Sequence, residues 1–447
     1  MSLTSNPEIP IEPATRRWGR LGLFGHLDFR KLWIGDTISQ FGTQVSILAI
    51  PYIATVLIKA SAFEVALLGT IEFLPFLLFT LPAGAWVDRL RRRPILICGD
   101  LLRAGALVTI PVAWELGVLT IWQLYLVGFV TGLGTVFFDV AYQSYLPSLV
   151  GTEDLVEGNG KLEASRASSQ VVGPGIAGGL ISLFSAPLAI LGDCISYVAS
   201  AIFVWRIRAP EAHPEAERIA AGMAREPLRS QVAAGLRFVV GNPYLRGIAG
   251  ATSSSNFFGN LGLAVLPVYL YRDLGLSAAT VGIIFGLGAI GSLVGALVAN
   301  RLAGAFGLGR TIIATIFIGG PAGILIPLAP ANDAVPWIVA SVFVGGFGSV
   351  AYNINQVSFR QAICPPEMQG RMNATMRFLV WGTIPIGAVL GGIVASIIGV
   401  HGGIWLGAIG GCLPFLSVLF SPVRTLVRMP EPVGSSDASG PALTAAG

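Results

Sequence analysis

The chain has few charged residues, histidines and cysteines. Asp, Glu, Lys and Arg make up only 12% of its 447 residues, whereas 53% are hydrophobic. A soluble domain carries about 25% charged residues, so this chain lacks the polar side chains to cover a water-facing surface. Its four cysteines lie far apart and mostly within apolar stretches. This spacing indicates neither a disulfide framework nor a zinc site.

Signatures of catalysis are also missing. The sequence contains no nucleotide-binding P-loop, no cluster of zinc ligands and no pattern that pairs a nucleophile with a base. We therefore expect neither an enzyme nor a cofactor. Without a nucleotide site, any energy-requiring process must be driven by an ion gradient or by the gradient of a solute. We interpret the ion as the proton. The net charge of +4 comes from basic residues in short loops, so no nucleic-acid partner is expected.

Long apolar runs take the place of charge. Stretches of about 20 apolar residues recur, each long enough to cross the hydrocarbon core of a bilayer as a helix. The 57 glycines suit membrane helices that approach one another closely. The sequence predicts an all-α membrane protein with twelve spans, near residues 32–58, 62–87, 94–113, 118–146, 161–183, 187–206, 245–271, 280–301, 311–330, 336–362, 371–398 and 402–421.

Five segments follow from this pattern. A tail covers residues 1–31, a six-helix bundle covers 32–206, a polar amphipathic linker covers 207–244, a second six-helix bundle covers 245–421 and a flexible tail covers 422–447. Two similar halves around one linker predict a central cavity where the halves meet.

The distribution of Lys and Arg sets the expected orientation. Basic residues cluster before the first span, after the second span, in the linker and after the last span, whereas the opposite loops contribute only Lys59 and Arg272. The positive-inside rule then places both termini and the linker in the cytoplasm. We expect a multi-pass protein of the cell (inner or plasma) membrane whose partners are the lipid bilayer and a small-molecule solute, and which functions as a monomer.

The loop between the second and third expected spans carries a recognisable motif. GAWVDRLRRRP, beginning at Gly84, resembles the loop pattern G-x-x-x-D-R/K-x-G-R/K-R/K of the major facilitator superfamily. Arg91 replaces the second glycine of the pattern, as in the drug and siderophore exporter branch, which includes macrolide efflux proteins and enterobactin exporters. The halves also resemble each other: GTVFFDVAYQ at 134–143 is similar to GGFGSVAYN at 345–353.

The resemblance implies that this loop is a conformational latch between the halves. In the family, the loop carboxylate meets the helix of span 11, and the arginines bind a carboxylate on span 4, for which Asp139 is the candidate. The alternative is a basic loop that only anchors to lipid headgroups. Gly84 would allow close approach of a neighbouring helix. The latch residues are Gly84, Asp88, Arg89, Arg92, Arg93, Asp139 and Arg103.

VVGPGIAGG at 171–179 resembles the glycine-proline motif that the family associates with proton-driven exporters, although Ala177 occupies a usual glycine position. Its residues are Gly173, Pro174 and Gly178. Proline frees a backbone carbonyl, and glycines allow close helix packing at a pliable point.

Acidic residues inside the spans are the candidates for proton handling, because charge within a membrane is costly. Glu72 lies near the middle of the second span, where loss of water favours the protonated carboxyl group. Asp36 is the second candidate. The alternatives are that Glu72 is a structural hydrogen-bond donor or that it contacts the solute. Asp100 and Arg103 are three residues apart on one helix face and should pair. Asp139 is expected to form a structural or gating pair with Arg103 or the loop arginines and not to carry a proton.

Polar residues gather on the spans that open each three-helix repeat, which the fold uses as cavity walls. Gln40 shares a helix face with Asp36 and Thr43. Arg166 is a candidate for binding an anionic solute, and the role of Asp193 stays open. The expected cavity residues are Gln40, Thr43, Tyr142, Gln143, Arg166, Asn256, Asn260, Tyr352, Asn353 and Gln356.

These residues favour a proton-coupled exporter of an amphipathic small molecule, such as a drug or siderophore. The mixture of aromatic and amide groups suits a bulky, partly apolar solute. Two alternatives stay open: uptake by proton symport on the same fold, and a membrane sensor or assembly factor that transports nothing.

Overall fold

The computed structural model describes residues 19–87, 90–151, 154–209, 211 and 228–427. All regular secondary structure in these residues is helical. Helices follow from the long apolar runs, because a backbone surrounded by lipid must satisfy its hydrogen bonds within the segment.

Six long helices form the N-terminal half: α1 (Leu27–Tyr52), α2 (Ala62–Val87), α3 (Arg92–Glu115), α4 (Ile121–Val150), α5 (Leu155–Phe184) and α6 (Ala186–Trp205). A π-helical turn, Ile53–Leu57, extends α1. Part of the expected tail at 1–31 is instead structured: a 3-10 segment covers Gly19–Gly25, and α1 begins at Leu27. The reason is burial, since Leu23 and Phe29 have no exposed surface.

The C-terminal half contains α9 (Pro243–Leu263), α10 (Leu266–Val268), α11 (Ala278–Phe306), α12 (Leu308–Ala322), α13 (Leu325–Leu328), α14 (Ala334–Ile363), α15 (Pro366–Trp381), α16 (Thr383–Gly410) and α17 (Pro414–Leu419). Short turns lie between some of them: a π turn at Tyr269–Asp273 and 3-10 turns at Ala331–Asp333 and Pro422–Thr425. In the linker, α8 covers Leu228–Gly241 and packs on α15. The rest of the linker, apart from its first residues, lies outside the described residues.

Within the described residues, ten stretches are long and apolar enough to cross a membrane. One of them, Met368–Leu419, has 52 residues. At 1.5 Å per residue it would extend about 78 Å as a straight helix, more than twice the hydrocarbon core. The backbone of α16 leaves the helical region at Gly399, where φ is 84°, so this stretch turns back. The helix α9 is not among the ten.

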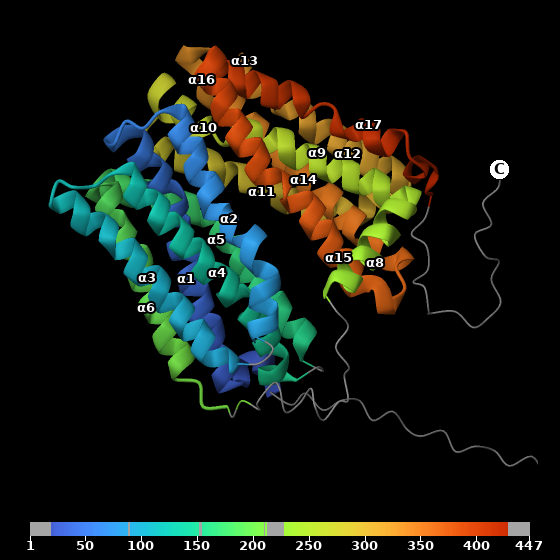
Figure 1. Ribbon diagram of the computed structural model, residues 1–447, viewed down its shortest axis with the longest axis horizontal. Coiled ribbons are helices and arrows are strands. Elements are labelled where there is room, and N and C mark those ends of the chain that lie inside the picture. The colour runs from blue at the N-terminus through green and yellow to red at the C-terminus, as the bar shows by residue number, and fades with distance from the viewer. Residues whose placement is uncertain (1–18, 88–89, 152–153, 210, 212–227, 428–447) are drawn as a thin grey trace, which may run out of the picture.

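The two halves pack against each other through two pairs of helices, α5 with α11 and α2 with α16 (Figure 1). At the end that carries the α1–α2 loop, buried apolar side chains from both halves form one core, with members that include Val45 in α1 and Ile404 in α16. At the opposite end each half has its own core. We call the first the closed end and the second, which carries α8 and the α2–α3 turn, the linker end. The halves therefore share an apolar core at one end and have separate cores at the other.

Candidate functional site

Hydrogen bonds and rings join the halves at the closed end. Arg272, at the end of the π turn after α10, donates from Nη2 to the carbonyl oxygens of Thr55 and Ala60, 2.8 Å from each. Tyr52 and Tyr271 meet edge to face with ring centroids 5.0 Å apart. These contacts cross from one half to the other, so the closed end is held by polar as well as apolar interactions.

The glycine-proline motif lies at the contact between α5 and α11. A Cβ atom at Gly178 would lie 2.9 Å from the Cα of Ala279, and one at Gly282 would lie 3.0 Å from the carbonyl carbon of Pro174. At Gly173 a Cβ would come 2.8 Å from the Cβ of Gln44 in α1. The motif thus allows two helices from different halves to touch backbone to backbone, whereas α5 continues as one helix through Pro174.

An aromatic contact crosses the interface nearer its middle. The ring of Trp381, the last residue of α15, meets Phe73 and Phe76 of α2 at centroid distances of 6.0 and 6.4 Å. We call these three rings the aromatic bridge. The guanidinium of Arg377 lies 4.6 Å from the Trp381 ring centroid. A cation–π contact therefore extends the bridge from α2 toward the linker end.

Glu72 lies next to the aromatic bridge in sequence and points toward α4. A Cβ atom at Gly128 would lie 2.8 Å from its Cγ and 3.6 Å from its Oε1. The side chain is half-buried, and no described residue hydrogen-bonds its carboxyl group. A glycine at position 128 leaves room for this acid between the two helices. Its proposed titration stays a prediction.

Asp139 and Arg166 are exposed side chains on α4 and α5. The positive charges of Arg103, Arg166 and, from the other half, Arg377 all act on Asp139, although no ion pair of Asp139 closer than 4 Å occurs among the described residues. Of the arginines expected to contact Asp139, Arg93 instead binds the end of α6 through its guanidinium, and Arg89 lies outside the described residues.

Asp100 and Arg103 form the expected pair. Their side chains are buried, and Nη2 lies 2.5 Å from Oδ1. The guanidinium also lies 4.5 Å from the Phe138 ring centroid and 4.2 Å from that of Tyr197. The other oxygen of Asp100 is buried without a hydrogen-bond partner among the described residues. This pair sits inside the N-terminal half, between α3, α4 and α6.

Two further acids share this interior. Asp193 on α6 accepts hydrogen bonds from Ser46 and, at 3.0 Å, from Ser196. Asp36 on α1 is 6% exposed, and Gln40 is its neighbour. Three buried carboxyl groups therefore share the single guanidinium of Arg103 with the more exposed Asp139, and its one positive charge can balance only one of these four acids.

The structure divides the expected cavity residues by location. Gln143, Arg166 and Asn353 are exposed, whereas Gln40, Tyr142, Asn256 and Asn260 are half-buried. Two hydroxyl groups form hydrogen bonds inside their own halves: Thr43 bonds Tyr197 at 2.8 Å, and Tyr352 bonds Thr252 at 2.7 Å. The assignment of these residues to the cavity stays a prediction.

The amides of α9 and α14 mostly bond to backbone or to each other. Asn256 donates to the carbonyl of Val380 at 3.1 Å, and Asn260 donates to that of Asn256 at 2.9 Å. Gln356 is buried and donates to Asn353 at 2.8 Å. The Asn256 contact ties α9 to α15 beside Trp381.

Only part of the expected latch lies in the described residues, because Asp88 and Arg89 do not. A Cβ atom at Gly84 would have no other atom within 4 Å, so the expected close approach of a helix there does not occur in this arrangement. The backbone amides of Arg92 and Arg93 donate to the carboxylate of Glu211. Arg93 donates from its side chain to the carbonyls of Val204, at 3.1 Å, and Trp205, so it caps the end of α6.

The three residues of the aromatic bridge and Arg377 are not predicted by the sequence. Phe73 and Phe76 look like ordinary apolar span residues, and only contact with another half distinguishes them. A tryptophan directly before a glycine, Trp381-Gly382, is the available signal, because α15 ends there.

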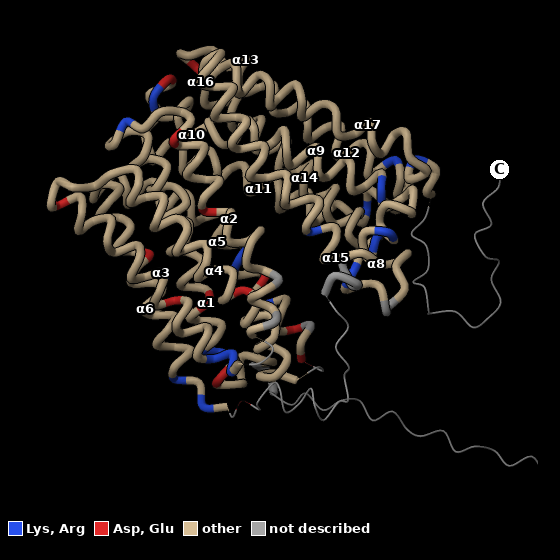
Figure 2. The backbone as a smooth tube through the Cα atoms, viewed as in Figure 1, with Lys and Arg blue, Asp and Glu red and all other residues tan. Residues whose placement is uncertain are grey.

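The two halves differ in charge. Helices α9, α11, α12, α14 and α16 contain no Asp or Glu. The acids in the interior of the described helices belong to the N-terminal half, and Figure 2 shows them along α2, α3 and α4, whereas basic positions gather near α8 and α15. The buried acids of the described residues, Asp36, Asp100 and Asp193, therefore all lie within the N-terminal half.

Solved structures with the same fold come in two states. The chain matches a bacterial homologue of the iron transporter ferroportin in its inward-facing state with a TM-score of 0.69 and 17% identity, covering 88% of this chain and 98% of that one. Against the outward-facing state the TM-score is 0.55 with 19% identity, over 88% and 98% of the two chains. The higher score belongs to the inward-facing state.

Curated relatives cover most of the chain. It is 24% identical over 415 residues to macrolide efflux protein A of Streptococcus pyogenes. The alignment covers 90% of this chain and 97% of that protein. It is 28% identical to the multidrug efflux pump Tap of Mycolicibacterium fortuitum, over 80% and 87% of the two chains. It is 25% identical to the enterobactin exporter EntS of Shigella flexneri, over 83% and 86%.

The family model of the Major Facilitator Superfamily matches residues 32–384 and 251–444, which together span most of the sequence. This match agrees with the resemblance of the α2–α3 turn and with the helical halves. The chain belongs to the major facilitator superfamily: it is a multi-pass membrane transporter for a small molecule, and not an enzyme.

Proposed function

We propose that this transporter exports an amphipathic small molecule, such as a drug or a siderophore, in exchange for protons. The observation that carries the proposal is the one-ended union of the halves: a shared core at the closed end and separate cores at the linker end. Rocking of the halves about the aromatic bridge would expose a central site to one side and then the other.

The linker end is the cytoplasmic end in this proposal. It carries exposed basic residues, including Arg91, Arg208 and Arg310, and the positive-inside rule assigns such ends to the cytoplasm. Both termini would then be cytoplasmic. The proposal also takes the 52-residue stretch as two crossings and α9 with its extension as another, which gives twelve crossings in two bundles.

The solute class follows from the side chains near the bridge. Aromatic rings (Phe73, Phe76 and Trp381) lie beside amides (Asn256 and Asn260). Rings give apolar contact area, and a few amides orient a solute. The efflux proteins that the chain resembles act, by their names, on macrolides, on several drugs and on enterobactin.

Glu72 is the proposed proton carrier. Its half-buried carboxyl group has no hydrogen-bond partner in the described part of the chain, so no structural bond would be lost when its proton leaves. Asp36 is the second candidate, but its carboxyl group lies in the crowded interior with Asp100 and Arg103. One chain contains both halves, so a monomer suffices for the cycle.

The test is transport into inverted vesicles that contain the purified chain. A macrolide or a catecholate siderophore should accumulate when the interior is acidic, and a protonophore should abolish the accumulation. Glu72→Gln should bind solute with unchanged affinity but lose the proton-driven accumulation. Glu115→Gln, at an exposed acid at the end of α3, is the matched control and should transport normally.

Three results would count against the proposal. Unchanged pumping by Glu72→Gln would remove Glu72 from the coupling step. Accumulation only in right-side-out vesicles would indicate uptake instead of export. No movement of any tested solute in either preparation would favour a membrane sensor.

A further inference from the structure

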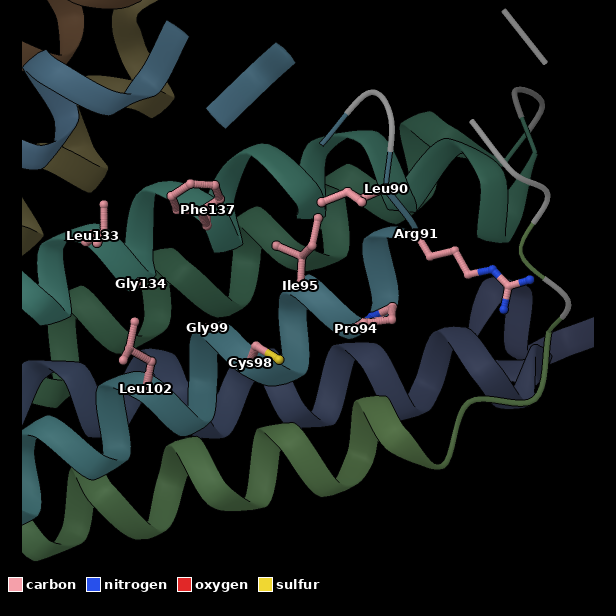
Figure 3. A pocket seen from close by; sticks show the side chains of 10 residues that line it. All are labelled: Leu90, Arg91, Pro94, Ile95, Cys98, Gly99, Leu102, Leu133, Gly134 and Phe137. Atoms are coloured by element: carbon pink, nitrogen blue, oxygen red, sulfur yellow. The ribbon is translucent and has the colours of Figure 1, made fainter. Parts of the chain in front are cut away.

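An apolar groove lies on the outer side of the N-terminal half, between α3 and α4. It has a volume of about 570 Å³ and is lined along its length by Ile95, Cys98, Leu102, Leu133 and Phe137, with Arg91 at one end (Figure 3). The helix α3 packs mainly on α4 and α6 of its own half. The groove is therefore separate from the interface at which a solute would be handled.

Two glycines form the floor of this groove. A Cβ atom at Gly99 would lie 3.2 Å from the carbonyl oxygen of Gly134, and one at Gly134 would lie 2.9 Å from Cγ of Arg103. The close approach of the two backbones removes the side chains that would otherwise fill the space. The hollow is built into the α3–α4 contact and lies among exposed apolar residues such as Leu90 and Leu102.

A second, more polar groove begins where the first ends. It shares Arg91, Pro94 and Cys98 with the apolar groove and adds Trp205 and Arg208. Trp205 is 66% exposed, and tryptophan prefers the level of lipid headgroups at the edge of a bilayer. The two grooves thus make one surface with a long apolar part and a basic end at the membrane boundary.

Several charged groups at the basic end already have partners. The carboxylate of Glu211 accepts hydrogen bonds from the backbone amides of Arg92 and Arg93, and the guanidinium of Arg93 donates to carbonyl oxygens at the end of α6. For the side chains of Arg91 and Arg208, the described residues offer neither a hydrogen bond nor an ion pair. Two cations beside an apolar groove complement a molecule that has an anionic group and a hydrocarbon chain.

We propose that this surface is a binding site for one anionic phospholipid, with an acyl chain between α3 and α4 and its phosphate on Arg91 and Arg208. Basic pockets between membrane helices on the positive side of a membrane protein bind anionic headgroups in this way. The site is independent of the proposed transport cycle, so its test does not depend on any solute.

Cys98 provides a built-in reporter, because it lines both grooves and is an exposed thiol, whereas Cys194 and Cys364 are buried. The purified full-length chain is placed in bilayers of phosphatidylcholine with or without phosphatidylglycerol. The rate of maleimide modification at Cys98 is then measured by peptide mass spectrometry. Phosphatidylglycerol should slow it severalfold, since each arginine near the surface contributes roughly fivefold in affinity.

Two pairs of variants separate the headgroup from the chain. Arg91→Gln with Arg208→Gln should abolish the preference for phosphatidylglycerol, whereas Arg310→Gln, an exposed arginine at the same end of the other half, should keep it. Leu102→Trp should fill the groove and remove the protection by either lipid. Leu101→Trp, on the same helix but outside the groove, should not.

Several outcomes would overturn the proposal. Equal protection by both lipids in the unaltered chain would mean that no anionic headgroup is bound. Protection by inorganic phosphate alone would mean that the acyl groove is not part of the site. Protection that rises with protein concentration and accompanies a dimer would mean that a second copy of the chain covers this face.

Discussion

Pro174 in α5 and Gly282 in α11 are in direct backbone contact across the two halves. A Cβ atom at position 282 would lie 3.0 Å from the carbonyl carbon of Pro174 and 3.3 Å from the Cα of Gly178. Any side chain at position 282 would therefore force the two helices apart. This contact therefore requires a glycine at position 282.

Gly282→Leu should weaken the closed end. Overpacking at a tight contact costs about 1–3 kcal/mol, and each increment of about 1.4 kcal/mol changes a two-state population about tenfold. We expect more molecules with the closed end open, measured as faster modification of a cysteine placed at Ala278, which is buried in the core shared by both halves. Gly175→Leu is the control, because nothing lies within 4 Å of a Cβ there. Equal effects of both variants would contradict the prediction.

Arg272→Gln should act at the same end through polar contacts. The guanidinium donates two hydrogen bonds to the carbonyls of Thr55 and Ala60, and a hydrogen bond to a charged group contributes about 1.5–3 kcal/mol. Loss of both should open the closed end and lower the turnover of transport. Lys59→Gln changes an exposed charge of the same region and should leave both measurements unchanged. Reduced protein stability without altered accessibility would argue against this role.

Arg103→Gln should destabilise the N-terminal half strongly. It removes the guanidinium that balances Asp100 in a buried position, and breaking a buried ion pair costs about 3–5 kcal/mol. The thermal unfolding temperature of the detergent-solubilised protein measures this loss. Combining the change with Asp100→Asn should restore much of the lost stability, because no unbalanced charge then remains at this pair. A double variant as unstable as the sum of the two single variants would show that the pair does not interact.

Trp381→Ala should loosen the aromatic bridge. Each edge-to-face ring contact contributes about 0.5–1.5 kcal/mol beyond its buried area, and Trp381 makes two of them with α2. If the bridge borders the solute site, the KM for an aromatic solute should rise several-fold. Phe378→Ala is the control, since this neighbouring ring on α15 is 64% exposed. An unchanged KM would remove the bridge from the site.

Much of the architecture follows from the sequence, because apolar runs bounded by charge define helix positions without tertiary information. The second span is predicted at 62–87, and α2 covers Ala62–Val87. The pairing of Asp100 with Arg103 also follows, since residues three apart share a helix face. A tail is predicted through residue 31, whereas α1 begins at Leu27. The sequence does not show that Leu23 and Phe29 are buried against distant helices.

The site is less predictable, since it depends on which face of each helix meets another helix. The sequence names Thr43 and Tyr352 as cavity candidates, but it does not predict that each hydroxyl bonds a partner in its own half. Phe73 and Trp381 gain their position only from contact between the halves. Arg93 meets the end of α6 and not Asp139 because the α2–α3 turn lies beside that end. Spacing along one helix contains no information about such partners.

The uneven distribution of acids has a consequence for how such a molecule can diversify. The helices α9, α11, α12, α14 and α16 of the C-terminal half contain no carboxyl side chain. A chimera with the C-terminal half of another family member would therefore keep every acid that lies buried among the described residues. Such a chimera would gain new side chains for recognising a solute and would retain the buried ionisable groups of this chain.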